Sequence, residues 1–174
     1  MKQHKRGGAY NLRIMSDVTN WGGIILDREI LNHLQKGDMV RIIIDSYKNK
    51  PYFSSRYVRI TNVLPNGYFK AIIEDSYNTY YCDYCDKEGT KGNYLYCCER
   101  DCCNFDCHLD CYKKHPEIKY CNCEIFKRPF QNGESIILKK NNISEIPNWS
   151  PNTRKLIAIY ENNENRGYMF TGFR

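Results

Sequence analysis

Alternation of apolar and polar residues predicts several strands in the first half of the chain. Residues 38–45 (DMVRIIID) and 56–63 (RYVRITNV) alternate branched apolar and polar residues, as strands with one buried face do. A shorter stretch of the same character covers residues 11–15 (NLRIM). Residues 65–67 (PNG) are typical of a turn, and residues 68–75 (YFKAIIED) follow them. We therefore predict a hairpin around this turn.

One segment of the first half has the periodicity of a helix instead. Within residues 27–35 (DREILNHLQ), the apolar residues Ile30, Leu31 and Leu34 fall on one helical face. Asp27 can cap the start of this helix, because its carboxylate can accept from the first free backbone N–H groups. We expect one short helix here, packed through that apolar face.

The strand pattern resumes in the last third of the chain. Residues 124–130 (EIFKRPF), 134–140 (ESIILKK) and 153–160 (TRKLIAIY) read as strands. The turns between and after them carry Asn and Gly. Strand-forming sequence therefore lies on both sides of residues 81–123, which we call the cysteine-rich segment.

The simplest fold for this pattern is one β-domain that carries the cysteine-rich segment as an insertion. Residues 1–80 and 124–174 would together form a small β-barrel or bent sheet, with residues 81–123 inserted in one of its loops. Such insertions are geometrically easy, because the two ends of a hairpin lie close together. We predict a mostly β protein with one or two short helices.

All ten cysteines of the chain lie between Cys82 and Cys123. A disulfide framework usually joins distant segments of a small secreted chain, and the N-terminal sequence (MKQHKRGGAYN) has no apolar stretch of the kind that a secretory signal needs. Clustered thiols instead indicate metal ligands in a reducing compartment. Since the chain also lacks a run of about 18 apolar residues, we expect an intracellular protein, cytoplasmic or nuclear, with no membrane partner.

The spacing of these residues gives four pairs of candidate zinc ligands. Structural Zn²⁺ takes four Cys or His ligands in a tetrahedron, so four pairs predict two ions. A third ion would require all twelve Cys and His residues of this region. A segment this short cannot bury enough apolar surface to fold alone, and metal binding would supply the missing free energy. In chain order the pairs are Cys82 with Cys85, Cys97 or Cys98 with Cys102 or Cys103, His108 with Cys111, and Cys121 with Cys123.

The order of the ligands resembles that of a PHD finger. A RING finger has four cysteines after its histidine, whereas three follow His108 here. The phrase CCNFDCHLDC (residues 102–111) is similar to the PHD signature, and the spacing from Cys103 to His108 and on to Cys111 is the one usual in that family. The resemblance implies a cross-brace of two zinc sites. One would use Cys82, Cys85, His108 and Cys111, and the other Cys98, Cys103, Cys121 and Cys123.

Two other zinc-finger families share features with the cysteine-rich segment. Its doubled cysteines, a Cys-Cys-x3-Cys-Cys run, also occur in the PHD-like part of ADD domains. Residues 104–115 resemble a ZZ finger, which would use Cys107 and His115 but would leave the last two cysteines unexplained. Outside a metal site, Cys97, Cys102 and Cys107 would be buried thiols, and His115 would face solvent.

The flanking sequence carries a resemblance of its own. Residues 36–75 (containing KGDMVRIII and NGYFKAIIED) and residues 132–147 (NGESIILKKNNISEIP) are similar to small bacterial β-domains grouped as the domain of unknown function DUF2314. That family has no settled activity, so the resemblance implies a fold only. The composition, rich in Asn, Ile, Lys and Tyr, is typical of AT-rich genomes such as those of large DNA viruses and some protists.

Charge separates the chain into two regions of opposite sign. The cysteine-rich segment has six Lys/Arg and eight Asp/Glu, whereas the rest has 20 and 12. Two zinc–thiolate sites would bring the segment to about −5, which suits a basic peptide or protein. The PHD resemblance likewise implies histone tails and similar basic peptides as partners. The basic remainder, with its interleaved aromatic residues, makes nucleic acid an alternative partner.

No catalytic motif accompanies these candidate metal ligands. The sequence has no nucleophile elbow, P-loop, His-Glu-x2-His or paired acidic motif, and a surplus of ligands favours closed, structural zinc sites over an open catalytic one. We predict a non-enzymatic zinc-finger binding or adaptor protein without a small-molecule substrate. A ubiquitin ligase with a RING-like finger is the one enzymatic alternative.

Overall fold

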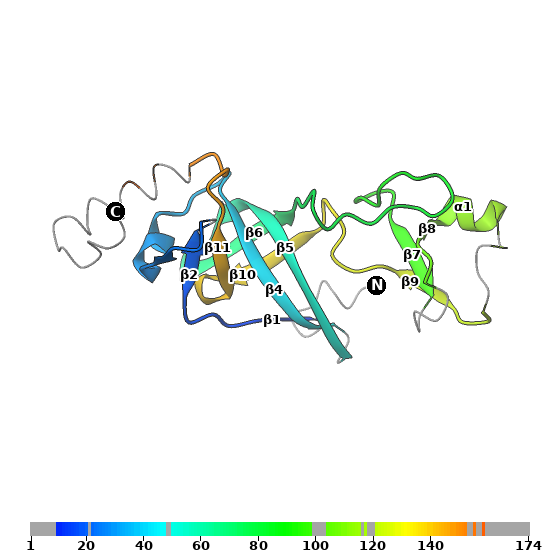
Figure 1. Cartoon of the computed structure of the whole chain (residues 1–174), viewed down its shortest axis with the longest axis horizontal. Coiled ribbons are helices and arrows are strands. Elements are labelled where there is room, and N and C mark those ends of the chain that lie inside the picture. Colours follow the sequence, from blue (N-terminus) through cyan, green and yellow to red (C-terminus); the bar gives the residue numbers. More distant parts are fainter. Residues whose placement is uncertain are drawn as a thin grey trace.

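The computed structural model of this chain shows two β-sheets at opposite ends of an elongated molecule (Figure 1). The larger sheet has eight strands and the smaller three. Among the described residues, the longest helices are α1 (Leu109–Lys114) and the 3-10 helix η2 (Arg28–His33), with six residues each. The prediction of a mostly β protein with short helices is therefore confirmed. The structure describes residues 10–20, 22–47, 50–98, 104–115, 117, 121–152, 155 and 158.

The large sheet is open and bent. Its strands follow the order β10-β6-β5-β4-β11-β2-β3, with β1 paired to β4 beside this path. In the described residues the end strands β10 and β3 do not pair with each other, so the bent-sheet form of the prediction is right and the closed barrel is wrong. The strands are β1 (Tyr10–Leu12), β2 (Val18–Asn20), β3 (Ile25–Leu26), β4 (Met39–Tyr47), β5 (Lys50–Val63), β6 (Tyr68–Ile73), β10 (Ser135–Lys139) and β11 (Ile143–Ile146).

One face of the large sheet forms the main hydrophobic core. Val40, Ile42 and Ile44 of the central strand β4 are fully buried at every second position, as the period of two in a strand requires. On β10, Ile136 and Leu138 are buried while their neighbours are exposed. Burial of each such side chain contributes about 1.5–3 kcal/mol, so the alternation in the sequence fixes which face of each strand turns inward.

The predicted hairpin is confirmed by the pairing of β5 with β6, in which Val63 lies opposite Phe69. Asn66 and Gly67 of the turn both have positive φ, 66° and 74°. Asn and Gly adopt this conformation at lower cost than other residues. The PNG sequence therefore sets the turn, and the turn sets the register of the two strands.

The predicted first helix forms as the 3-10 helix η2. The carboxylate of Asp27 accepts a hydrogen bond from the Glu29 N–H at 2.9 Å, and Ile30 and Leu31 pack into the main core. The strand predicted for residues 153–160 falls mostly outside the described residues. Lys155 and Ala158, which are described, have helical backbone, so that prediction is wrong at these two positions.

The small sheet contains a strand that the sequence analysis assigned to the β-domain. Its order is β8 (Cys107–His108), β7 (Leu95–Cys98) and β9 (Ile125–Lys127). In β9, Ile125 lies opposite Cys98 of β7. The small sheet thus extends past residue 123, and the chain returns to the large sheet only after β9.

Buried polar groups join the two parts of the molecule. Two guanidinium groups lie near the ring of Tyr80, that of Arg56 at 5.3 Å from the ring centroid and that of Arg128 at 4.7 Å. Gln131 accepts from the Leu95 N–H at 2.8 Å and donates to the Leu95 carbonyl at 3.1 Å. Because Arg56 and Gln131 are each 2 % exposed, these contacts are shielded from water. The segment with the small sheet is therefore held against the large sheet over several residues.

Candidate metal centre

Four candidate ligands from three segments meet beside the small sheet and form what we call the first cluster. Cys82 and Cys85 precede β7, His108 ends β8, and Cys111 lies in α1. Their ligand atoms all lie within 4.8 Å of one another. The first cluster holds the same four residues that the sequence analysis placed on one ion. Cys82 and His108 are buried, whereas the other two are partly exposed.

The loop from Cys82 to Asp86 has the hydrogen bonds of a metal-binding knuckle. The N–H groups of Tyr84 and Cys85 both point at the Cys82 sulfur, at 3.4 Å each. The Asp86 N–H donates to the Cys82 carbonyl at 2.9 Å, and Asp86 itself has a φ of 64°. A sulfur that accepts backbone N–H groups is stabilised as a thiolate. The two-residue spacing of the cysteines therefore shapes a turn that prepares the first ligand.

A backbone carbonyl fixes the tautomer of His108. The Nε2 atom lies 3.1 Å from the carbonyl oxygen of Glu88, and because a carbonyl can only accept, Nε2 must carry the proton. The neutral ring then has its lone pair on Nδ1, which faces the Cys85 sulfur at 3.3 Å. An outer hydrogen bond of this kind orients a metal-binding histidine. Glu88 thus contributes to the first cluster, and nothing in the sequence pattern pointed to it.

The thiols of the first cluster differ in acidity. Burial opposes ionisation of Cys82, but the backbone N–H groups around its sulfur lower its pKa to about 6. Burial and the neighbouring thiols raise the pKa of Cys111 to about 11. The Cys82 thiol therefore ionises more readily than the Cys111 thiol, and binding of a metal ion would favour the thiolate form of its cysteine ligands.

A second cluster consists of three cysteines at the other end of the small sheet. Cys98 on β7 and Cys121 and Cys123 before β9 have sulfur atoms within 4.8 Å of one another. Two of these sulfurs, those of Cys98 and Cys121, are 3.3 Å apart. The predicted fourth ligand, Cys103, and its alternative, Cys102, lie outside the described residues.

Cys97 lies outside both clusters. It is adjacent to Cys98 on β7, and neighbouring residues of a strand point to opposite faces. The two thiols therefore cannot face one metal ion from this strand. Cys97 is buried. Burial opposes the charge of Arg128, but the Asp106 carboxylate, followed by Cys97, raises the pKa of Arg128. In this structure Cys98 belongs to the second cluster and Cys97 does not.

The two residues that a ZZ-type site would need also lie outside the clusters. The Cys107 sulfur is 3.9 Å from that of Cys82, and burial, followed by the charge of Cys82, raises the pKa of Cys107. It therefore keeps its proton beside the first cluster. His115 stacks on Tyr84 with ring centroids 3.6 Å apart, and its Nδ1 lies 3.2 Å from a Glu117 carboxylate oxygen.

The clusters share one small hydrophobic core. Phe105 is 3 % exposed and packs with Cys82 and Cys98, one ligand from each cluster. Phe105 also stacks on Tyr112 of α1, with ring centroids 6.3 Å apart. The sequence predicts Phe105 as a core residue between the two sites, which its burial confirms, whereas its stacking on Tyr112 depends on tertiary packing.

Both clusters could hold a metal ion. In a tetrahedral zinc site with Zn–S bonds of about 2.3 Å, neighbouring sulfurs are about 3.8 Å apart. The ligand atoms of the first cluster, at 4.8 Å or less, would need to approach by about 1 Å at most to reach this geometry. Three thiols and one imidazole also form a donor set of the soft and borderline type that zinc prefers.

The fold and the clusters define an open, bent β-sheet protein with a segment inserted between two of its strands whose two clusters could hold metal ions. Searches of protein-family models, curated proteins and solved structures found no match to this chain. No helix among the described residues has the length and apolar character that a membrane crossing requires.

Proposed function

We propose that this chain is a non-enzymatic binding protein in which two Zn²⁺ ions stabilise a module that recognises a basic segment of another protein. The observation that carries the proposal is the four-ligand first cluster of Cys82, Cys85, His108 and Cys111. Four protein ligands fill a tetrahedron, so substrate or water has no open position. This favours a structural role for zinc.

The small core around the clusters explains why the module would depend on zinc. Its fully buried members are five residues, three of them cysteines: Cys82, Leu95, Cys98, Phe105 and Cys107. Two large apolar side chains cannot offset the conformational entropy of a segment of this length. Structural zinc contributes about 10–16 kcal/mol in zinc-finger peptides at neutral pH. A contribution of this size is enough to offset the remaining conformational entropy cost of folding the module.

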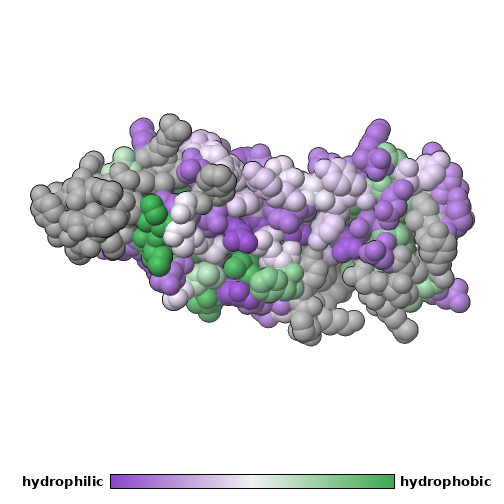
Figure 2. All heavy atoms as spheres, viewed as in Figure 1, coloured by the Kyte–Doolittle hydropathy of each residue, from purple (hydrophilic) through white to green (hydrophobic). Residues whose placement is uncertain are grey.

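The charge of the module supports a basic partner. The cysteine-rich segment has two more Asp/Glu than Lys/Arg, and two zinc–thiolate sites would add further negative charge. Its exposed carboxylates include those of Asp83, Asp86, Glu88 and Asp110, among four exposed lysines in the described part of the segment. Figure 2 shows a mostly hydrophilic face on which hydrophobic side chains form small separate groups. A partner recognised on such a face would be bound mainly through charge and hydrogen bonds. The ligand order of a PHD-like finger, a family that reads basic peptides, agrees with this sign.

Metal analysis tests the structural half of the proposal. The purified chain should hold two zinc ions, and chelation should abolish the dispersed amide signals of the small sheet. Cys111→Ser should lose one ion, whereas Cys107→Ser, a matched change of a thiol outside the clusters, should keep both. A metal-free folded chain, or disulfides found by mass, would refute the proposal.

An array of basic, neutral and acidic peptides tests the binding half. The zinc-loaded chain should retain Lys/Arg-rich peptides, and retention should fall as salt is raised. Binding of nucleic acid in place of peptides would favour the alternative of a nucleic-acid-binding protein. Ubiquitin transfer with a panel of E2 enzymes would favour the ligase. Either result together with a blank array would refute peptide recognition.

A further inference from the structure

A cavity of about 490 Å³ lies where the cysteine-rich segment meets the large sheet. We call it the junction pocket. It is open to solvent and is formed by the start of β4, the middle of β5, the loop after β6, the start of the cysteine-rich segment and the turn after β11. Its lining includes four aromatic residues and three carboxylates, Tyr57, Tyr77, Tyr81, Trp149, Glu74, Asp75 and Glu88.

Aromatic rings form one wall of the junction pocket. Tyr57 is in edge-to-face contact with Trp149, with ring centroids 5.1 Å apart, and Tyr77 lies 6.0 Å from Tyr57. Tyr77 is 71 % exposed and Trp149 42 %, although burial would be expected of rings that only completed the core. Ring faces left open to solvent attract cations through their quadrupoles.

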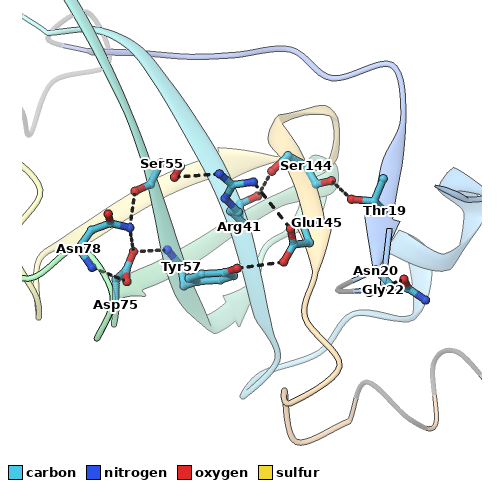
Figure 3. A network of polar contacts seen from close by, with 10 residues as sticks. All are labelled: Thr19, Asn20, Gly22, Arg41, Ser55, Tyr57, Asp75, Asn78, Ser144 and Glu145. Atoms are coloured by element: carbon cyan, nitrogen blue, oxygen red, sulfur yellow. Dashed lines mark hydrogen bonds and ion pairs between the residues drawn. The ribbon is translucent and has the colours of Figure 1, made fainter. Parts of the chain in front are cut away.

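Hydrogen bonds fix the base of this wall (Figure 3). The Tyr57 hydroxyl donates to Glu145 at 3.0 Å, and Glu145 also faces Arg41 at 3.7 Å. Burial and the Glu145 carboxylate raise the pKa of Tyr57 to about 12, so the hydroxyl keeps its proton at neutral pH. The Tyr57 ring is therefore held in place before any ligand arrives.

Asp75 holds the loop that carries Tyr77. Its carboxylate accepts from the N–H groups of Tyr57, Tyr77 and Asn78, at 3.1, 2.8 and 3.1 Å, and Figure 3 shows it between β5 and this loop. Asp75 is 2 % exposed, so it adds a fixed negative charge beneath the pocket. The aromatic wall and the carboxylate are thus parts of one preformed structure.

The balance of charge in the lining is negative. Glu74 is paired with Arg59, the one Lys or Arg among the described lining residues. Asp75 and Glu88 remain as a net charge of about −2. Glu88 is exposed, so its carboxylate is accessible to a ligand. Aromatic faces combined with excess carboxylates complement a cation and repel an anion.

We propose that the junction pocket binds a lysine or arginine side chain of a basic peptide segment, with its charged group between the aromatic wall and Glu88. This inference rests on the proposed function and locates its site at the junction, with most of the lining contributed by the large sheet and its loops. The volume of the pocket accommodates one such side chain together with part of the backbone that carries it.

The first cluster supports one side of the junction pocket. Tyr81 and Glu88, which line the pocket, pair with each other through an antiparallel bridge. The carbonyl oxygen of Glu88 also accepts a hydrogen bond from the Nε2–H of His108. Metal bound at the first cluster would therefore stabilise this side of the pocket, and chelation should weaken cation binding even though the pocket residues are not ligands.

The test titrates the zinc-loaded chain with short capped peptides that carry one central lysine, arginine, norleucine or glutamate. The readout is the NMR signal of the Trp149 indole N–H, which Trp149→Phe identifies because the chain has two tryptophans. The lysine and arginine peptides should move this signal with saturation, and they should bind at least about threefold more tightly than the norleucine peptide.

Substitutions in the pocket and a matched control outside it test whether the cationic side chain binds in the junction pocket. Tyr77→Ala and Glu88→Gln should each weaken binding about threefold or more. Asp17→Asn removes an exposed carboxylate outside the pocket and should leave binding unchanged. Amide spectra of each variant confirm that it is folded.

The outcomes separate the two proposals. Equal binding of the norleucine peptide, or unchanged binding by both pocket variants, would overturn the junction pocket as a cation site. If longer basic peptides are still retained by these variants, recognition by the chain stands and only its location is wrong. If neither short nor long basic peptides bind the zinc-loaded chain, both proposals fail.

Discussion

Gly89→Ala should destabilise the junction between the two sheets more than the same substitution at any other glycine that the structure describes. Gly89 is buried, and its N–H donates to the Tyr80 carbonyl at 3.0 Å. A Cβ atom there would lie 2.2 Å from Gln131 Oε1 and 2.5 Å from Leu95 Cγ. Real Cβ atoms do not approach other atoms this closely, so both side chains would have to move.

The size of the effect follows from what Gln131 holds. Its Oε1 accepts from the buried Leu95 N–H at 2.8 Å, and displacement would leave that donor unsatisfied, at a cost of about 1–3 kcal/mol. Overpacking against Leu95 adds about 1–3 kcal/mol. We expect Gly89→Ala to lower the free energy of unfolding by about 2–6 kcal/mol, a large part of the stability of a domain this size.

Urea unfolding of the zinc-loaded chain, followed by circular dichroism, measures this loss. Gly22→Ala is the matched control, because its added Cβ would meet only Asn20 Oδ1, at 3.4 Å, and it should change the free energy of unfolding by less than about 1 kcal/mol. Equal stability of the two variants would refute the argument that Gln131 and Leu95 pack closely against Gly89.

Three further predictions test the second cluster, the buried charges and the fixed tyrosine. Cys98→Ser should release one of two bound zinc ions, measured by elemental analysis, whereas Cys97→Ser should keep both; the reverse would show that the register of β7 is wrong. Glu134→Gln should lower the free energy of unfolding by about 3–5 kcal/mol, because it leaves the 5 % exposed ammonium of Lys127 without its carboxylate; a loss below 1 kcal/mol in urea unfolding would contradict this. The raised pKa of Tyr57 means that its contribution to stability is complete below pH 10 and is lost as the pH rises from about 10 towards about 12. Between pH 9 and pH 11, the free energy of unfolding should therefore fall less with rising pH for Tyr57→Phe than for the unsubstituted chain. An equal fall in the two proteins would count against the Glu145 contact.

Local sequence was a good guide wherever local physics decides the structure. The hairpin around Asn66 and Gly67 and the cap at Asp27 depend on residues a few positions apart, and both are seen in the structure. The alternation in β4 and β10 likewise revealed their buried faces. Short strands were missed, because β2 and β3 have three and two residues and become strands only through pairing.

The candidate site likewise contains residues that the sequence pattern reveals and residues that only the fold brings together. The spacing of cysteines and one histidine pointed to the residues of the first cluster, since ligand type and order leave a trace in the sequence. The carbonyl of Glu88 leaves no such trace, because any residue could supply it. The rings of Tyr57 and Trp149 are 92 positions apart along the chain, and only the fold of the large sheet brings them into contact.

The way in which the cysteine-rich segment is inserted explains how metal and peptide could act on each other. Just before the segment begins, the ring of Tyr80 lies near two guanidinium groups. After the segment ends, the side chain of Gln131 hydrogen-bonds to the backbone of Leu95. Loss of zinc would disorder the small sheet and with it the contact of Gln131 with Leu95, whereas the core of the large sheet contains none of the candidate ligands. The large sheet should therefore stay folded after chelation, while the small sheet and the Glu88 side of the junction pocket lose their order. Metal content would then control peptide affinity through the inserted segment.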